Sequence, residues 1–136
     1  MDHRLRGSIR LRANSRCEYC GFPEVFSRRP FHCDHVVAQQ HGGETYFSNL
    51  AWSCNHCNLH KGPNLSSVDP ESRKTVRLFN PRIDRWDEHF YWRGAHLVGK
   101  TPIGRATASL LCANDPMVVV TRAQLMEEGA AADRIR

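Results

Sequence analysis

The first half of the chain contains short apolar runs that are separated by turn signals. Residues 8–15 are predicted to form a short helix, and the weak alternation over residues 31–38 favours a strand. The His-Gly-Gly sequence at 41–43 indicates a turn, because glycine adopts positive φ at little cost. Another short helix should follow the cysteine pair at 54–57 and end near the Gly-Pro pair at 62–63, because proline cannot continue it.

The second half predicts a connector, a hairpin and two helices. Residues 64–81 are predicted to be a connector, since prolines interrupt them. Two short runs within 89–98 flank an Arg-Gly-Ala turn and predict a β-hairpin. Thr101 is a good N-cap for a helix that extends to about Ala113. An amphipathic segment at 116–128 is predicted to end at Gly129, with a frayed tail to Arg136. The mixture predicts an α+β fold.

Length and charge narrow the class of protein. The 136 residues suffice for one ordinary domain, although a chain of this size benefits from an additional stabilising element such as a bound metal ion. No stretch has the apolar length of a signal peptide or a membrane span, which predicts a cytoplasmic protein without a membrane partner. The net charge is +5, and the excess lies in residues 1–30 and 73–105. Two basic stretches suit a phosphate-rich partner, and a solvated surface is the equally good alternative.

The cysteines indicate a metal site, because disulfides are disfavoured in the cytoplasm. Two CxxC pairs are separated by 33 residues and offer four thiolates, from Cys17, Cys20, Cys54 and Cys57. Four thiolates match tetrahedral Zn²⁺, and a closed four-sulfur site is structural rather than catalytic. Chance or redox-active pairs are the alternative. The long interval predicts a compact unit folded between the two pairs. Cys33 and Cys112 are expected to be small buried core residues.

Polar residues between and after the cysteine pairs occur in a specific order. Asp34-His35 precedes the glycine turn, Asn49-Leu50 follows it, and Cys57-Asn58 and Lys61-Gly62 close the segment. From Cys17 to Gly62 this order resembles the HNH endonucleases. The resemblance implies a ββα-metal (His-Me finger) core in which two strands and a helix hold one divalent ion. Residues after this segment resemble an extension found in small bacterial HNH proteins.

The resemblance also implies roles for four residues. His35 matches the general base, and Asp34 matches the metal-binding residue before it. Asn49 matches the middle motif residue, which orients His35 by tying back the loop. Asn58 stands where the third motif residue, often histidine, ligates the metal, so the triad here is His-Asn-Asn. Oxygen ligands from Asp and Asn favour Mg²⁺ or Mn²⁺ over softer ions.

These roles agree with elementary chemistry, but each residue also has a plainer interpretation. A neutral histidine can accept a proton from water near pH 7, and a cation can stabilise charge on phosphate. A histidine in a strand is more often structural, however, and Asp34 and Asn58 could be capping residues. His60 is a weaker candidate ligand, because residues two apart on a helix face away from each other.

Nucleic-acid contacts are expected from Lys61, Arg28 and Arg29, with ordinary solvation as the alternative. The aromatic residues within 86–92 are expected to belong to the core, although they could stack on bases. We expect a zinc-stapled HNH core at 1–63 and an extension at 64–136 packed on it as one structural domain.

The main hypothesis is a divalent-metal-dependent endonuclease that cuts DNA, with structural Zn²⁺, catalytic Mg²⁺ or Mn²⁺, and no small-molecule substrate. The alternative is a non-catalytic zinc module that binds nucleic acid or a protein. The neighbouring Asp34 and His35 favour the enzyme, because a binding module does not need a base beside a carboxylate. A redox or metal-storage protein is a third hypothesis, which the long segment between the cysteine pairs opposes.

Overall fold

The computed structural model describes residues 1–129 and combines short helices with short antiparallel strands. The predicted tail lies outside these residues. The α-helices are α1 (His3–Arg12), α2 (Asn55–Lys61), α3 (Trp86–His89), α4 (Pro102–Leu110) and α5 (Pro116–Glu127). The 3₁₀ helices are η1 (Glu24–Phe26), η2 (Gln39–His41) and η3 (Phe47–Asn49). The strands are β1 (His32–His35), β2 (Leu50–Ser53), β3 (Ser66–Val68), β4 (Thr75–Arg77), β5 (Phe90–Arg93) and β6 (His96–Gly99). The α+β class is therefore confirmed.

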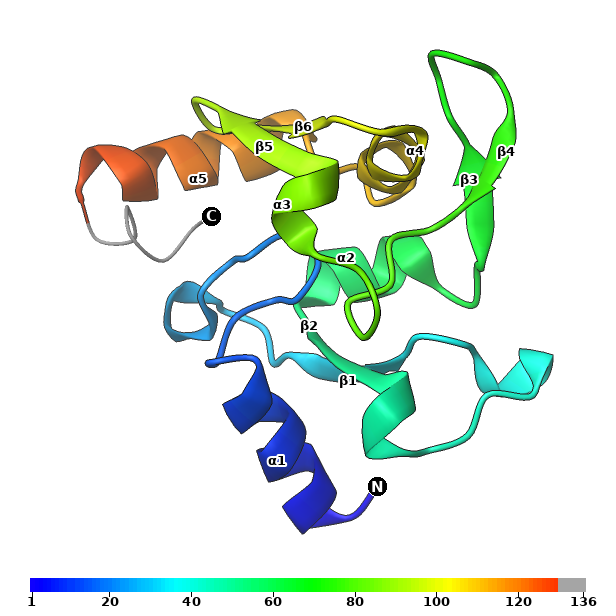
Figure 1. Ribbon diagram of the computed structural model, residues 1–136. Coiled ribbons are helices and arrows are strands. Elements are labelled where there is room, and N and C mark those ends of the chain that lie inside the picture. Colours follow the sequence, from blue (N-terminus) through cyan, green and yellow to red (C-terminus); the bar gives the residue numbers. More distant parts are fainter. Residues whose placement is uncertain (130–136) are drawn as a thin grey trace.

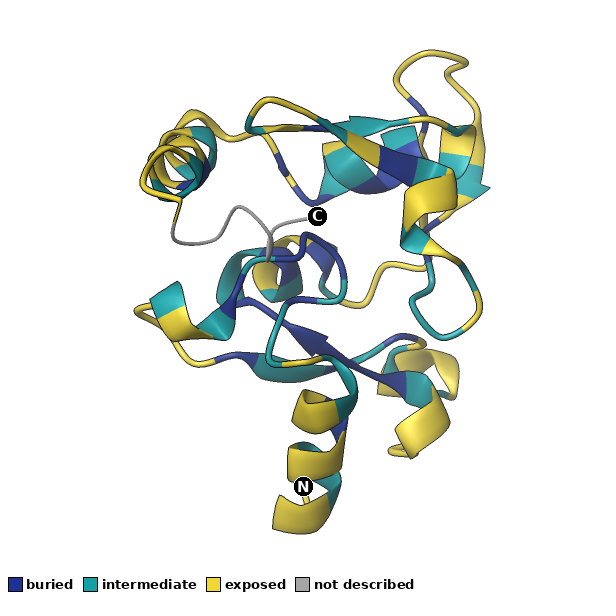
Figure 2. Cartoon of the chain, turned by 60° about the vertical axis from the view of Figure 1, so that its left-hand side comes forward, coloured by how far each residue is buried: buried dark blue, intermediate teal, exposed yellow. Residues whose placement is uncertain are grey.

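The strands form three antiparallel pairs, and the first pair leads directly into α2 (Figure 1). In this pair Asp34 lies opposite Ala51, and His35 lies opposite Leu50. All four residues of β2 are buried, and they appear as a dark blue arrow in the middle of the molecule (Figure 2). The chain then enters α2 at Cys54, whose sulfur accepts a hydrogen bond from the Cys57 amide at 3.4 Å.

The second half of the chain lies above the first pair of strands in the view of Figure 1, with α2 between them. One hydrophobic cluster extends through both halves, from Ile9 and Trp52 to Phe90 and Leu111. The β5–β6 hairpin packs tightly on α4, so that a Cβ atom on Gly99 of β6 would collide with the backbone nitrogen of Arg105. Thr101 caps α4 by accepting a hydrogen bond from the Gly104 amide, as its position before Pro102 predicted.

The aromatic residues near the last hairpin are mainly core, as predicted. Phe90 is buried and contacts both Phe79 and Trp86, with ring centroids 5.3 and 5.2 Å apart. Trp86 also packs against Trp92 at 5.9 Å. Tyr91 is the exception, since its side chain faces solvent on the other side of the strand. Alternation along β5 explains this difference, because neighbouring residues point to opposite faces.

The predicted bounds of the first helix were wrong, and so was the prediction of a connector without strands. The first helix occupies residues 3–12 rather than 8–15, because the Asp2 side chain caps it by accepting from the Arg4 amide. The connector at 64–81 contains the β3–β4 hairpin. The buried Asp69 carboxylate stabilises the turn of this hairpin, since it accepts hydrogen bonds from two backbone amides and from Arg105 in α4. The Arg105 guanidinium holds the pKa of Asp69 well below its usual range.

The expectation that both remaining cysteines are core residues was also wrong. Cys112 is exposed and has a left-handed backbone conformation, at φ +47°, just after the end of α4. Cys33 is half-buried in β1.

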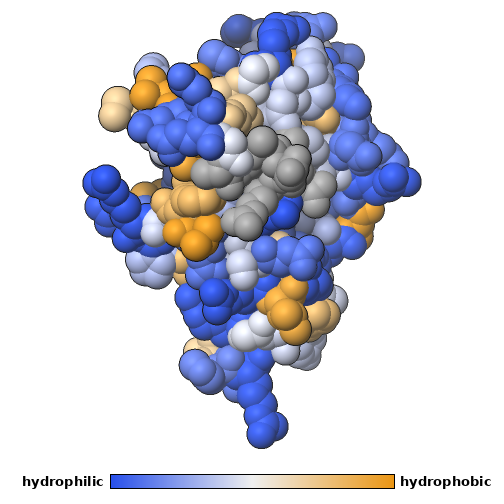
Figure 3. All heavy atoms as spheres, turned by 90° about the vertical axis from the view of Figure 1, so that its left-hand side faces the viewer, coloured by the Kyte–Doolittle hydropathy of each residue, from blue (hydrophilic) through white to orange (hydrophobic). Residues whose placement is uncertain are grey.

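The surface is largely polar in the view of Figure 3, where hydrophobic residues form scattered spots. Among residues 1–129, no helix is both long and apolar enough to cross a membrane.

Candidate metal and catalytic sites

The four predicted cysteines meet in one buried cluster. The sulfur atoms of Cys17, Cys20, Cys54 and Cys57 all lie within 4.8 Å of one another, and all four residues are buried. The Cys20 and Cys54 sulfurs are 3.8 Å apart. Zinc–sulfur bonds of about 2.3 Å in a tetrahedron require sulfur–sulfur distances of roughly 3.8 Å. The cluster therefore fits a structural zinc ion.

Local backbone geometry places the first pair of sulfurs. The Gly21 amide donates to the Cys17 carbonyl oxygen at 2.8 Å, and Gly21 itself has φ +78°. The Cys20 amide points at the Cys17 sulfur, 3.5 Å away. This arrangement repeats at Cys54 and Cys57, where the turn becomes the first turn of α2. The identical CxxC spacing thus produces two similar turns, which we call the first knuckle (residues 17–20) and the second knuckle (residues 54–57), although only the second leads into a helix.

A buried arginine from α5 lies near the cluster. The Arg122 side chain donates to the carbonyl oxygens of Ala113 and Ala95 at 2.7 and 2.6 Å, and it lies over the Trp92 ring. Burial lowers the pKa of Arg122, while the nearby cysteine sulfurs oppose that change. Four thiolates with one Zn²⁺ carry a net charge of −2, so a positive group here offsets buried negative charge.

A separate cavity of about 300 Å³ brings together three of the predicted site residues, Asp34, His35 and Asn58. Asp34 and His35 come from the end of β1, and Asn58 comes from the middle of α2, next to Cys57. The rest of the lining is Cys33, Ala38, Gln39, Gln40, Gly62 and Pro63. A hard cation prefers oxygen ligands, and this cavity offers a carboxylate and an amide beside an imidazole.

The Asp34 side chain is only 6% exposed and already has two donors. The Tyr19 hydroxyl donates to Oδ2 at 2.6 Å, and the Lys61 ammonium lies 3.1 Å from Oδ2 and 3.4 Å from Oδ1. Burial raises the pKa of Asp34, although Lys61 and Tyr19 act in the opposite direction. Burial and the Asp34 carboxylate raise the pKa of Tyr19, so its hydroxyl remains a donor.

Two contacts position His35 and the loop that follows it. His35 Nε2 lies 2.9 Å from the Thr45 hydroxyl. The side-chain oxygen of Asn49 accepts a hydrogen bond from the Val37 backbone N–H at 2.9 Å. Its side-chain nitrogen donates to the carbonyl oxygens of Val37 and Glu44 at 3.0 and 2.9 Å. The loop folds back so closely that a Cβ atom at Gly43 would collide with the Val37 carbonyl oxygen. Asn49 therefore joins the two ends of the loop next to His35.

The expected phosphate contact by Lys61 needs correction. Lys61 is buried, and its ammonium also donates to the carbonyl oxygens of His35 and Val36 at 3.1 and 3.2 Å. An exposed amine is needed to meet a phosphate, so Lys61 acts inside the fold. Arg28 and Arg29 are exposed and follow η1, outside the cavity that holds His35.

The remaining histidine near Asn58 does not join the cavity. His60 is exposed, and its Nδ1 lies 2.8 Å from the His56 carbonyl oxygen one turn earlier. His56 in turn contacts the Cys112 carbonyl oxygen at 3.0 Å. Neither histidine lines the cavity that contains Asp34.

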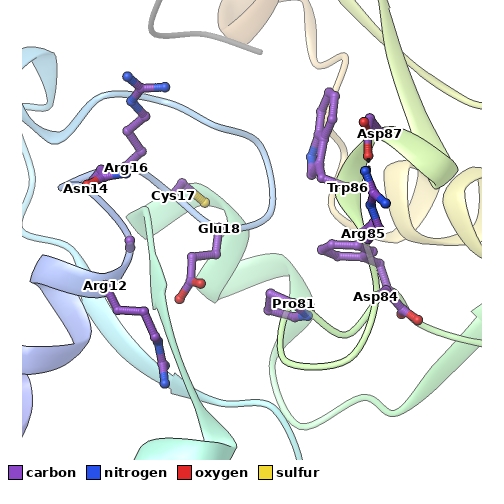
Figure 4. Close-up of a pocket in the computed structure, with 12 residues that line it drawn as sticks. Arg12, Asn14, Arg16, Cys17, Glu18, Pro81, Asp84, Arg85, Trp86 and Asp87 are labelled. Carbon is purple, nitrogen blue, oxygen red and sulfur yellow. Dashed lines mark ion pairs between the residues drawn. The ribbon is translucent and has the colours of Figure 1, made fainter.

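A larger cavity of about 410 Å³ lies between residues 12–18 and 79–87 (Figure 4). Its charged groups come from both sides, and its three carboxylates already contact arginines, Asp87 through Arg85 at 3.9 Å. Glu18 contacts Arg82, and Asp84 accepts from Arg77 at 2.7 and 2.8 Å. The cavity near His35 is smaller but holds the residues suited to hydrolysis, so chemistry rather than size identifies the candidate site.

Sequence reasoning missed Tyr19 and Thr45. Tyr19 lies between the cysteines of the first pair, 15 positions before Asp34, and no spacing rule connects the two. Thr45 lies in the loop with no pattern to distinguish it. Both contacts depend on the folded loop and knuckle.

A family model described as HNH endonuclease matches residues 17–64. This match confirms the resemblance for the segment that holds both cysteine pairs, Asp34, His35, Asn49 and Asn58, and the chain therefore contains an HNH domain. Searches of curated proteins and of solved structures found no match. An HNH domain indicates nuclease activity or nucleic-acid binding.

Proposed function

We propose that this protein is a divalent-metal-dependent endonuclease that hydrolyses phosphodiester bonds of DNA. The observation that carries this proposal is the convergence of Asp34, His35 and Asn58 on one cavity. Within this proposal β1, β2 and α2 form a ββα-metal core. No membrane or small-molecule partner is required.

In the proposed reaction His35 is the general base. With a proton on Nε2 shared with Thr45, Nδ1 keeps its lone pair and can accept a proton from water. Asn49 keeps the loop closed, so that Thr45 and His35 stay together. Asp34 and Asn58 would hold Mg²⁺ or Mn²⁺ through oxygen atoms. When bound, this ion stabilises negative charge on the phosphate and the leaving oxygen.

The four cysteines have a different task in this proposal. A zinc ion held by Cys17, Cys20, Cys54 and Cys57 would fix the first knuckle against α2, which carries Asn58. Residues 1–63 would form the nuclease core and 64–136 the extension, in one structural domain. The contact of Trp86 Nε1 with the Tyr19 carbonyl oxygen at 2.8 Å supports this, because it joins the extension to the first knuckle.

DNA would be held through its phosphates by exposed arginines such as Arg28 and Arg29. One observation favours the second candidate function, a zinc-containing module that binds nucleic acid without cutting it. The Asp34 carboxylate already contacts Lys61 and Tyr19, which a purely structural residue would also do. The two candidates differ in whether bound DNA is cut.

The experiment is cleavage of supercoiled plasmid by zinc-loaded protein in buffer freed of other divalent ions. We expect no cleavage without added metal and nicking when Mg²⁺ or Mn²⁺ is supplied. Zinc content is measured before and after, because a strong chelator could remove the structural ion as well. Binding without cutting under every divalent ion would replace the enzyme by the non-catalytic module.

A further inference from the structure

Two donors hold the Asp34 carboxylate, one from the first cysteine knuckle and one from the helix that begins at the second. Tyr19 lies between Cys17 and Cys20, and its side chain is 1% exposed. Lys61 is the last residue of α2, the helix that begins at the second knuckle, and it is 2% exposed. A zinc ion that joins the knuckles would therefore also set the distance between these two donors.

The two oxygens of Asp34 have unequal partners. Oδ2 accepts the short hydrogen bond from Tyr19, at 2.6 Å, and is the nearer oxygen to Lys61, at 3.1 Å. Oδ1 accepts one hydrogen bond, from the Lys61 ammonium at 3.4 Å, which is long for a charged hydrogen bond and leaves a second lone pair on this oxygen. A carboxylate fixed through one oxygen can present the other to a cation without losing its orientation.

We propose that Tyr19 is a positioning residue that couples the four-cysteine site to the affinity of the catalytic ion, by fixing Asp34 through Oδ2 so that Oδ1 binds the metal. Lys61, at the end of the helix that begins at the second knuckle, is the other donor. The inference rests on the proposed function, because it concerns the same ion. The four-cysteine site then determines metal affinity as well as stability.

The packing around Tyr19 explains how it can transmit position. Its ring packs edge to face against Phe79, with centroids 6.5 Å apart. Its carbonyl oxygen accepts from Trp86 Nε1 at 2.8 Å. The hydroxyl is thus held from the ring and from the backbone, and a displacement of the knuckle would displace the donor on Asp34.

The test uses Tyr19→Phe, which removes the hydroxyl and keeps the ring, with Tyr91→Phe as the matched control. Tyr91 lies in β5, where its hydroxyl accepts from Arg93 at 2.9 Å, away from Asp34. Zinc content, thermal stability and Mn²⁺ binding are measured without DNA, the last by electron paramagnetic resonance of free Mn²⁺. Loss of such an outer partner typically weakens metal binding by about 10–100-fold.

We expect Tyr19→Phe to keep one zinc ion and to bind Mn²⁺ more weakly by that factor, while Tyr91→Phe binds it like the parent. Cleavage by Tyr19→Phe should recover when the Mn²⁺ concentration is raised. Unchanged Mn²⁺ affinity with reduced stability would overturn the proposal, since Tyr19 would then only support the fold. In that outcome the proposed function would still stand, because the parent protein itself binds Mn²⁺.

If Tyr19→Phe loses zinc or does not fold, Trp86→Phe takes its place. Trp86 is half-buried, and this change removes the donor on the Tyr19 carbonyl oxygen together with part of the indole packing. A folded Trp86→Phe protein with full zinc should bind Mn²⁺ several-fold more weakly. Parental Mn²⁺ affinity in this variant would overturn the coupling. A parent that neither binds Mn²⁺ nor cuts DNA would instead reject the proposed function itself.

Discussion

Replacing Asn49 by alanine removes the three hydrogen bonds that close the loop between β1 and β2. They join the side chain to the Val37 amide, the Val37 carbonyl oxygen and the Glu44 carbonyl oxygen. A hydrogen bond contributes about 1 kcal/mol net, so three contribute about 3 kcal/mol to keeping the loop closed. Since about 1.4 kcal/mol is a factor of ten in an equilibrium constant, loop opening should increase by roughly 100-fold.

The assay is hydrogen exchange at the Gly43 amide, which donates to the Ala38 carbonyl oxygen within the loop and keeps this acceptor in the variant, together with plasmid nicking. Exchange should be faster in Asn49→Ala by roughly that 100-fold, since exchange of a closed loop follows its opening. Nicking should fall as well, because Thr45 lies in this loop and contacts His35.

Asn114→Ala is the matched control. Asn114 similarly accepts from the Leu97 amide and donates to the Leu97 carbonyl oxygen, both at 2.8 Å, but holds β6 instead. It should lower stability without an equal loss of nicking. Parental exchange at Gly43, or parental nicking despite fast exchange, would refute the positioning role of Asn49.

Three further changes have defined outcomes. Cys54→Ser should lose zinc and unfold or aggregate, and metal analysis of the parent should find about one tightly held Zn²⁺; a folded, reduced parent without zinc would contradict this. Asn58→Ala should raise the metal concentration needed for cleavage and Asn58→His should shift preference towards Ni²⁺ or Zn²⁺, whereas unchanged metal dependence in both would remove Asn58 from the site. Arg122→Leu should lower the free energy of unfolding by about 3 kcal/mol in urea titrations, because two carbonyl oxygens lose a charged donor, while Arg93→Leu on the surface should change it little.

The sequence predicted those parts of the fold that depend on local chemistry. Identical CxxC spacing predicted a cluster that the structure contains, and Thr101-Pro102 predicted the start of α4. The family resemblance, confirmed over residues 17–64, led to the residues that line the cavity near His35. Local spacing and motif order were sufficient for these because each element depends mainly on its own neighbours.

The parts that the sequence did not predict depend on tertiary contacts. The β3–β4 hairpin is polar and short, and its turn depends on Asp69 meeting Arg105 from another element. The sequence predicted that Lys61 would be exposed. In the structure its ammonium donates to two carbonyl oxygens in the bend after β1 and pairs with Asp34. The positive charge of Lys61 did not by itself indicate whether its side chain would be exposed or buried.

The most direct test of the central proposal is the comparison of His35→Ala with the parent in paired binding and nicking assays. A general base accepts a proton from water and does not hold DNA, so its removal should slow nicking by about 10²- to 10⁴-fold. Affinity for duplex DNA in a shift assay should stay at the parental value, and His96→Ala, an exposed histidine on β6, should change neither. Nicking by His35→Ala at the parental rate would contradict the proposal and leave His35 with a structural role.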